Sequence, residues 1–88
     1  MIIGGKEYKF MLNMGTLKKF QRISGKNPFK VFDDFGAQET SWLIQAGIEQ
    51  AGQNITDEEL DNMTIDEMTS AGNSIAKAMK DFAPTGKN

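Results

Sequence analysis

Two adjacent glycines near the start of the chain, Gly4 and Gly5, constrain the fold more than any other feature. Glycine adopts the positive φ angles that a two-residue hairpin turn requires, and this pair separates Ile2-Ile3 from an alternating segment, residues 6–12. The sequence therefore predicts an N-terminal β-hairpin with one face on the core. The predicted inward residues are Tyr8, Phe10 and Leu12, and Met11 is the apolar exception on the outer face.

After residue 12 the apolar residues recur at the spacing of three and four that is typical of helices. Asn13 is a good helix cap, Gly25 a good helix stop, and Pro28 suits a first helical position. The expected helices cover residues 14–24, 28–35, 38–51, 57–62 and 65–82.

The predicted fold class is therefore α+β, with a small N-terminal β-hairpin packed on a mainly α-helical body of about four helices. The apolar arc of residues 38–51 is wide, which predicts a central helix, and the helix from Ile65 is expected to close the core. Residues 1–82 form a single domain in this interpretation, and residues 83–88 form a polar tail that we expect to be disordered.

The 88 residues contain neither cysteine nor histidine. The absence of cysteine excludes disulfides and thiolate metal sites. The absence of histidine removes the commonest general base and the commonest zinc ligand. No apolar run approaches the roughly 20 residues that span a bilayer. We expect a non-enzymatic cytoplasmic protein that has no cofactor, no metal and no membrane partner.

Residues 54–68, NITDEELDNMTIDEM, contain six carboxylates, which raises the alternatives of a metal site, an acidic docking surface and two helix starts. A calcium loop that begins at Asp57 requires glycine at its sixth position and glutamate at its twelfth. The chain has Asn62 and Met68 there. The spacing therefore argues against an EF-hand.

The same stretch contains the spacing of a capping box twice, first as Thr56 with Glu59 and then as Thr64 with Glu67. Carboxylates in the first turn of a helix also complement the positive end of the helix dipole. We interpret the stretch as two consecutive helix starts.

Charge is distributed unevenly along the chain. Residues 1–36 carry seven Lys and Arg against three acids (+4), residues 37–72 carry eight acids and no base (−8), and residues 73–88 carry three Lys against one Asp (+2). Either the opposite poles neutralise each other across the fold or between copies, or the basic part meets a phosphate backbone. No basic-aromatic interleaving or helix-turn-helix pattern supports the second alternative, so we expect no nucleic-acid partner.

Six methionines and a run of aromatic residues point to a binding surface. Methionine is flexible and polarizable and suits surfaces that accept varied helical partners. Met14, Met63, Met68 and Met79 are expected to fill core gaps or to staple helix ends. The aromatic residues either pack in the core or remain exposed at an interface, because a thin core does not bury all of them. The candidate partner-binding residues are Met11, Phe29, Phe32, Phe35 and Trp42.

The chain resembles the small tail assembly chaperones of long-tailed, siphovirus-like bacteriophages over residues 1–82. The resemblance rests on the opening IIGGKEYKFMLNMGTLKKFQRISGKNPF, which has a glycine turn, a GKEY-like strand and a helix that ends in Gly25-Lys26. A helix rich in Ile, Leu and Ala follows, and then an acidic T-x-E-E helix start at residues 56–59.

The resemblance implies a non-enzymatic role in the host cytoplasm. Members of the family bind the long helical tape measure protein, keep it soluble, assist polymerisation of the tail tube and are absent from the mature virion. The expected partner is thus the tape measure protein, with the tail tube protein and further copies of the chain (a homo-oligomer) as additional candidates. The alternative is a small structural virion protein, such as a head–tail connector, which would share the α+β composition.

Family members are often made in two lengths, the longer one by a ribosomal frameshift near the end of the short form. The final residues, Gly86-Lys87-Asn88, can be encoded as GGA-AAA-AAY, which contains a run of A residues that permits slippage. One interpretation of the tail is therefore a joint to a longer product, and the other is a polar end without function.

Overall fold

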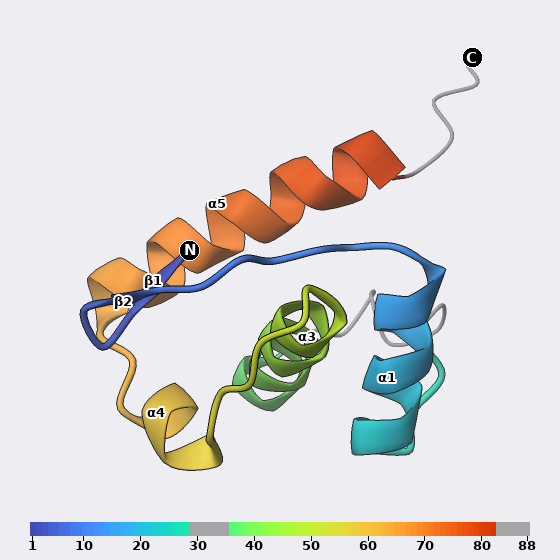
Figure 1. Cartoon of the computed structure of the whole chain (residues 1–88), viewed down its shortest axis with the longest axis horizontal. Coiled ribbons are helices and arrows are strands. Elements are labelled where there is room, and N and C mark those ends of the chain that lie inside the picture. Colours follow the sequence, from blue (N-terminus) through green and yellow to red (C-terminus); the bar gives the residue numbers. More distant parts are fainter. Residues whose placement is uncertain (29–35, 83–88) are drawn as a thin grey trace.

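The computed structural model describes residues 1–28 and 36–82. Its elements, in chain order, are the strands β1 (Ile2–Ile3) and β2 (Lys6–Glu7) and the helices α1 (Met14–Ser24), α3 (Ala37–Gln50), α4 (Asp57–Asp61) and α5 (Ile65–Phe82). The strands form an antiparallel hairpin at the N-terminal end of a mainly helical structure (Figure 1). The predicted α+β class is confirmed, and the bounds of the four described helices lie within one residue of the predicted ones.

Gly4 and Gly5 form the turn of the hairpin, with φ angles of 61° and 81°. Positive φ at both central residues is typical of a type I′ turn, whose twist matches that of the paired strands. Ile2 pairs with Glu7 and Ile3 with Lys6. Because Ile3 is fully buried while Ile2 is 53% exposed, one face of the hairpin belongs to the core and the other faces solvent.

The second strand is shorter than predicted, because its partner strand is short. The last paired position joins Met1 and Tyr8, where the Tyr8 main-chain N–H donates to Met1 O at 2.7 Å. The chain then stays extended up to α1 (Figure 1), but it bonds to the helical body, since Met11 N–H donates to Gly47 O at 3.1 Å. Burial still alternates as predicted, with Tyr8 buried, Phe10 half-buried and Met11 exposed.

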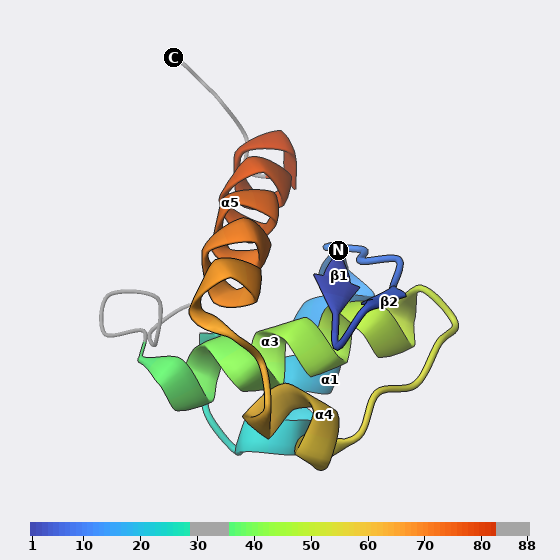
Figure 2. The same ribbon diagram turned by 90° about the vertical axis from the view of Figure 1, so that its left-hand side faces the viewer.

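Helix α3 is central, as its wide apolar arc predicts. α1 packs along one side of it, and the extended chain after β2 crosses over it (Figures 1 and 2). The ring of Phe10 lies so close to Gly47 that it occupies the place where a Cβ atom would be. The buried residues of this helix are Leu43, Ile44, Ala46, Gly47 and Ile48, and the core cluster continues through Ile3, Tyr8, Phe20, Ile55, Leu60, Ala71 and Ile75.

Both ends of α1 follow from its sequence. Asn13 accepts the N–H of Thr16 at 3.2 Å, and the Thr16 hydroxyl accepts the N–H of Asn13 at 3.1 Å, so the helix starts in a capping box. Gly25 ends it with a φ of 72°, the left-handed conformation that glycine adopts without strain.

Helix α5 lies beside the hairpin and projects from the other helices (Figure 2). Ala71 and Ile75 are buried in the core and Met79 packs against it, which confirms that this helix closes the core. Of the two roles predicted for Met14 and Met68, filling core gaps does not apply, because their exposed fractions are 51% and 44%, and stapling a helix end remains a prediction. Met14 begins α1 at its solvent side, and Met68 borders a groove that no described residue covers.

Candidate partner-binding site

The residues predicted to bind a partner are not brought together in the described part of the chain. Met11 is 46% exposed, as a partner contact would be. Trp42 packs half-buried against the core, and the Lys26 ammonium lies 5.7 Å from the centre of its ring. Trp42 lines neither of two hollows in the described surface, and Met11 lines one of them. The other predicted residues, Phe29, Phe32 and Phe35, lie outside the described residues, as do the predicted short helix around them and the tail at 83–88.

An open groove of about 560 Å³ lies between the first half of α3, the α4 helix and the start of α5. We call it the α3–α4–α5 groove. Ile44 and Leu60 contribute buried apolar side chains to it, whereas Met63 is half-buried and Met68 is largely exposed. The groove thus has a fixed apolar base and two flexible side chains at its rim. Its volume falls within the range of roughly 300–1,000 Å³ that is typical of ligand sites.

The sequence predictions assigned Met63 and Met68 to helix packing and did not identify this groove. One signal for it was available. Ile65, Met68 and Gly72 follow one another at spacings of three and four, so α5 carries a second apolar or small stripe beside the buried stripe of Ala71. Ile65 is 75% exposed. A single core face does not require two such stripes, and the second one borders the groove.

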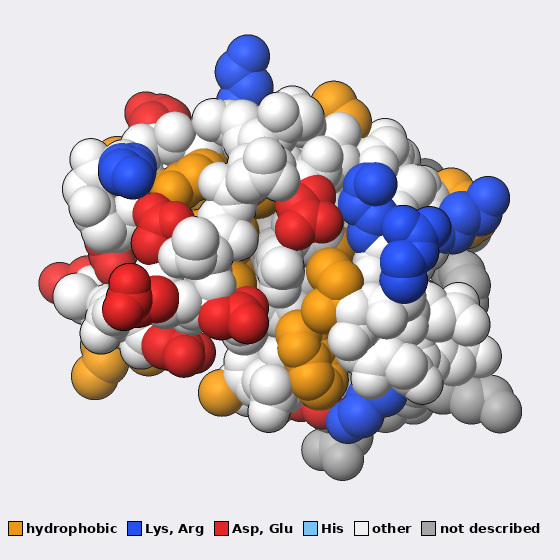
Figure 3. All heavy atoms as spheres, turned by 60° about the horizontal axis from the view of Figure 1, so that its bottom comes forward, with side chains coloured by type: hydrophobic (Ala, Val, Ile, Leu, Met, Phe, Trp, Pro, Cys, Tyr) orange, Lys and Arg blue, Asp and Glu red, His pale blue; other side chains and the backbone are white. Residues whose placement is uncertain are grey.

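The uneven charge of the sequence separates into two sides of the surface. In Figure 3 acidic side chains gather over the part of the molecule that carries α4, and Lys and Arg over the part that carries α1. Hydrophobic side chains remain visible in the band between them. Among the exposed residues, α4 has Asp57, Glu58 and Asp61, while α1 has Lys18 and Arg22.

Two ion pairs connect the basic and acidic parts of the chain. Lys26 Nζ lies 2.6 Å from Glu39 Oε2, and Lys6 Nζ lies 3.6 Å from Glu59 Oε2. The predicted neutralisation of the poles across the fold therefore occurs at these two places. The exposed acids of α4 take no part in an ion pair within residues 1–28 and 36–82.

Both predicted capping boxes are present. The Thr56 hydroxyl accepts the N–H of Glu59 at 3.1 Å, and Glu59 Oε1 accepts the N–H of Thr56 at 3.2 Å. In the second box the Thr64 hydroxyl accepts the N–H of Glu67 at 3.1 Å, and Glu67 Oε1 accepts the N–H of Thr64 at 3.1 Å. α4 and α5 begin directly after these threonines, at the residues that the sequence predicts.

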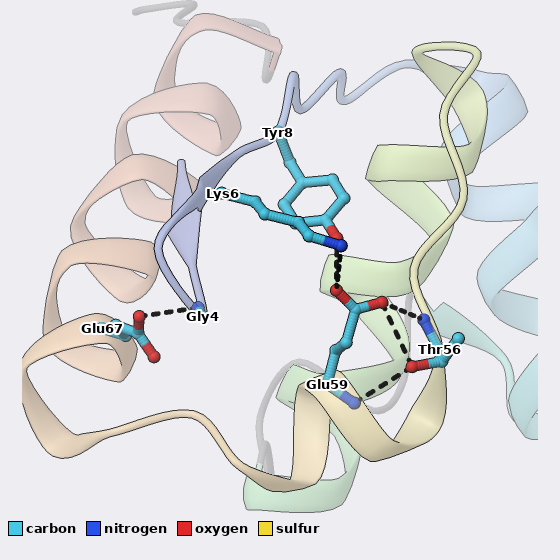
Figure 4. Close-up of polar contacts among 6 residues, drawn as sticks. All are labelled: Gly4, Lys6, Tyr8, Thr56, Glu59 and Glu67. Carbon is cyan, nitrogen blue, oxygen red and sulfur yellow. Dashed lines mark hydrogen bonds and ion pairs between the residues drawn. The ribbon is translucent and has the colours of Figure 1, made fainter.

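The second oxygen of each capping glutamate holds the hairpin (Figure 4). Glu59 Oε2 accepts the hydroxyl of Tyr8 at 2.6 Å and also pairs with Lys6. Glu67 Oε2 accepts the N–H of Gly4 in the hairpin turn at 2.8 Å. Each carboxylate therefore uses one oxygen to start a helix and the other to join that helix to the N-terminal strands. The sequence predicted the first role and not the second.

These hydrogen bonds shift the pKa values of the groups that make them. The Tyr8 hydroxyl, followed by the Thr56 N–H, holds the pKa of Glu59 below its ordinary value. The main-chain N–H groups of Thr64 and of the hairpin turn hold the pKa of Glu67 below its ordinary value. The bond to Glu59 raises the pKa of Tyr8, and burial raises it further. The shifts arise from contacts that hold the fold together, and neither glutamate lines the α3–α4–α5 groove.

The other four carboxylates of the acidic stretch are exposed, and their side chains have no hydrogen-bond partner in the described chain. They are Asp57, Glu58, Asp61 and Asp66, of which Asp61 lines the groove. Among the residues that the structure describes, no group of three or more acidic side chains is placed to hold a metal ion. No helix in that part of the chain has the length and apolar character to cross a membrane.

Comparisons of the chain with protein-family models, with curated proteins and with solved structures found no match.

Proposed function

We propose that this protein is a non-enzymatic tail assembly chaperone of a long-tailed bacteriophage. In this proposal it binds the tape measure protein in the host cytoplasm, keeps it soluble and assists polymerisation of the tail tube. The observation that carries the proposal is the open α3–α4–α5 groove, whose apolar base is flanked by two methionines. The resemblance of residues 1–82 to the tail assembly chaperones supports the same function.

The groove suits an apolar helical face. An amphipathic helix presents side chains at positions i, i+3, i+4 and i+7, which dock side by side into an apolar groove. Ile44 and Leu60 offer a base for such side chains, and Met63 and Met68 can change rotamer to fit different ones. A chaperone for a long helical protein must accept many segments of similar pattern, and adaptable methionines serve that requirement.

The charge around the groove favours a particular kind of helix. Asp61 lies in the groove lining, and Asp57 and Glu58 stand exposed on the same helix. Complementary charge steers partners and selects among them, more than it adds affinity. The occupant is therefore an amphipathic helix of the tape measure protein that has Lys or Arg beside its apolar residues.

Co-expression with the tape measure protein of the same phage tests this function. The wild-type chain should keep the tape measure protein soluble and should co-purify with it, whereas Met68→Asp should lose both effects. Met14→Asp is the matched control, because Met14 is similarly exposed, also lies in the first turn of a helix, and lines neither hollow. In both variants the helix dipole favours the new carboxylate.

A tape measure protein that stays insoluble with the wild-type chain would contradict the chaperone function. Detection of the chain in purified virions would support the structural alternative, such as a head–tail connector. The gene order gives an independent test, since the chaperone gene of this family lies between those for the tail tube and the tape measure protein.

A further inference from the structure

The outer side of α1 presents two cations that the fold leaves unpaired. Lys18 and Arg22 are both exposed, and α1 contains no acidic residue. Because they are four residues apart, they lie on one side of the helix, about 6 Å apart along its axis. Within residues 1–28 and 36–82 neither side chain takes part in an ion pair or a hydrogen bond. We call this pair the α1 basic face.

Helix α4 presents the opposite charge. Asp57 and Glu58 are exposed, and their side chains have no partner in the described chain. The sequence from residue 37 to residue 72 contains no Lys or Arg. The two lysines that reach this acidic part from outside bind Glu59 and Glu39 instead. The outer carboxylates, which we call the α4 acidic face, therefore remain without a cation.

The two faces lie on different sides of the molecule. Figure 3 shows the acidic side chains over the part that carries α4 and the basic ones over the part that carries α1, with a hydrophobic band between them. Within one copy the two faces are not in contact, but the α1 basic face of one copy matches the α4 acidic face of another. The net charge of −2 keeps the general repulsion between copies small.

We propose that a second copy of this chain docks on the α1 basic face through its own α4 acidic face. The contact is heterologous, because each copy contributes a different surface to it. One basic and one acidic face stay free at the ends of such a pair, so further copies add head to tail and form a ring or an open chain. Charged pairs between exposed side chains are screened by salt, which makes the association strongly dependent on ionic strength.

Two observations place the contact on α1 and keep it apart from the groove. Lys77 and Lys80 of α5 are also exposed, but Asp81 follows them directly and reduces the positive charge there. None of the four residues in the two faces lines the α3–α4–α5 groove. The docked copy therefore leaves the groove open, and the inference does not depend on the chaperone proposal.

Sedimentation equilibrium at millimolar protein concentration tests the contact. The weight-average mass of the wild-type chain should exceed the monomer mass at about 0.01 M salt and return to it at about 1 M, since the Debye length falls from about 30 Å to about 3 Å. Lys18→Glu/Arg22→Glu should be monomeric at both salt concentrations. Lys77→Glu/Lys80→Glu is the matched control, because it changes the net charge by the same amount and should still associate at low salt.

A mixture of two variants tests whether the contact joins different faces. Asp57→Asn/Glu58→Gln keeps the α1 basic face, removes the α4 acidic face with side chains of the same shape, and should be monomeric alone. Mixed with Lys18→Glu/Arg22→Glu at low salt, it should form a complex of twice the monomer mass and nothing larger, because one intact face remains on each variant. Such a complex also shows that both variants are folded.

Three results would overturn the proposal. The first is a wild-type chain that stays monomeric at low salt, and the second is a Lys18→Glu/Arg22→Glu variant that associates as the wild type does. The third is a mixture of the two variants that contains only monomers, although each variant has the helical circular dichroism of the wild type.

Discussion

Glu59 and Glu67 differ from their neighbours Asp61 and Asp66 in the contacts they make, although all four lie in one stretch of fifteen residues. Each glutamate bonds to a helix start and to the hairpin, whereas the two aspartates are exposed and their side chains have no partner in the described chain. The third position after a capping threonine explains the difference, because it turns the side chain back over the helix start. The acidic stretch thus has an inner side that joins the fold and an outer side that remains available to a partner.

The largest expected effect separates these two sides directly. Glu59→Ala should lower the urea midpoint of unfolding more than the loss of either capping threonine, because it removes the acceptor of Tyr8, Lys6 and Thr56 together. Asp61→Ala is the control from the outer side and should change the free energy of unfolding by no more than about 0.5 kcal/mol. Equal midpoints for Glu59→Ala and Asp61→Ala would contradict the division into an inner and an outer side.

The capping threonines should give the next largest effect. Thr56→Ala and Thr64→Ala each remove a cap oxygen and should each lower the free energy of unfolding by about 1 kcal/mol. Thr69→Ala is a suitable control, because Thr69 is exposed within α5 and alanine favours the helix. Chemical denaturation measures the free energy of unfolding of the three variants. A Thr56→Ala variant with the wild-type free energy of unfolding would show that the capping box does not stabilise α4.

A smaller and pH-dependent effect should come from the hairpin links. In the folded protein the pKa values of Glu59 and Glu67 lie below the ordinary 4.5, so the unfolded chain binds more protons at low pH. Their contribution to stability is complete above pH 4.5 and is lost as the pH falls through their folded pKa values. The pKa of Tyr8 is raised above 10.0, so its contribution is complete below pH 10.0 and is lost as the pH rises through its folded pKa.

Thermal unfolding over a series of pH values checks this dependence. Tyr8→Phe removes the hydroxyl that causes the largest part of the shift at Glu59, and it should weaken the dependence on pH at both ends. If the melting temperatures of Tyr8→Phe follow the wild-type values at every pH, the link between the hairpin and α4 contributes nothing to the pH dependence of stability.

Divalent cations should have the smallest effect. Calcium or magnesium should leave the melting temperature unchanged, because Glu59 and Glu67 are already bonded within the fold and no described group of acidic side chains is placed to hold a metal ion. A clear rise in the melting temperature with either ion would restore the metal-site interpretation of the acidic stretch.

Local sequence signals predicted the helices well because the signals are strong. Asn13, Gly25, Thr56 and Thr64 mark helix ends through bonds to residues no more than four positions away, so the sequence itself contains both partners. The apolar arc of α3 likewise identified the central helix.

Contacts between distant segments could not be predicted in the same way. Tyr8 and Glu59 are 51 positions apart, and no local pattern indicates that they meet. The length of β2 depended on how much of β1 was available to pair with it, and the exposure of Met68 depended on how α3, α4 and α5 leave a groove. Periodicity showed which residues share a face of α5, but it did not show which part of that face another element covers.

Methionine methyl NMR tests the binding site most directly, because the six methionines report on separate places in the chain. Met63 and Met68 line the α3–α4–α5 groove, Met1 and Met11 line the other hollow of the described surface, and Met14 lines neither. On addition of a soluble helical fragment of the tape measure protein, the methyl resonances of Met63 and Met68 should shift and that of Met14 should not. Shifts confined to Met14 or Met11, with Met63 and Met68 unchanged, would contradict the groove as the binding site.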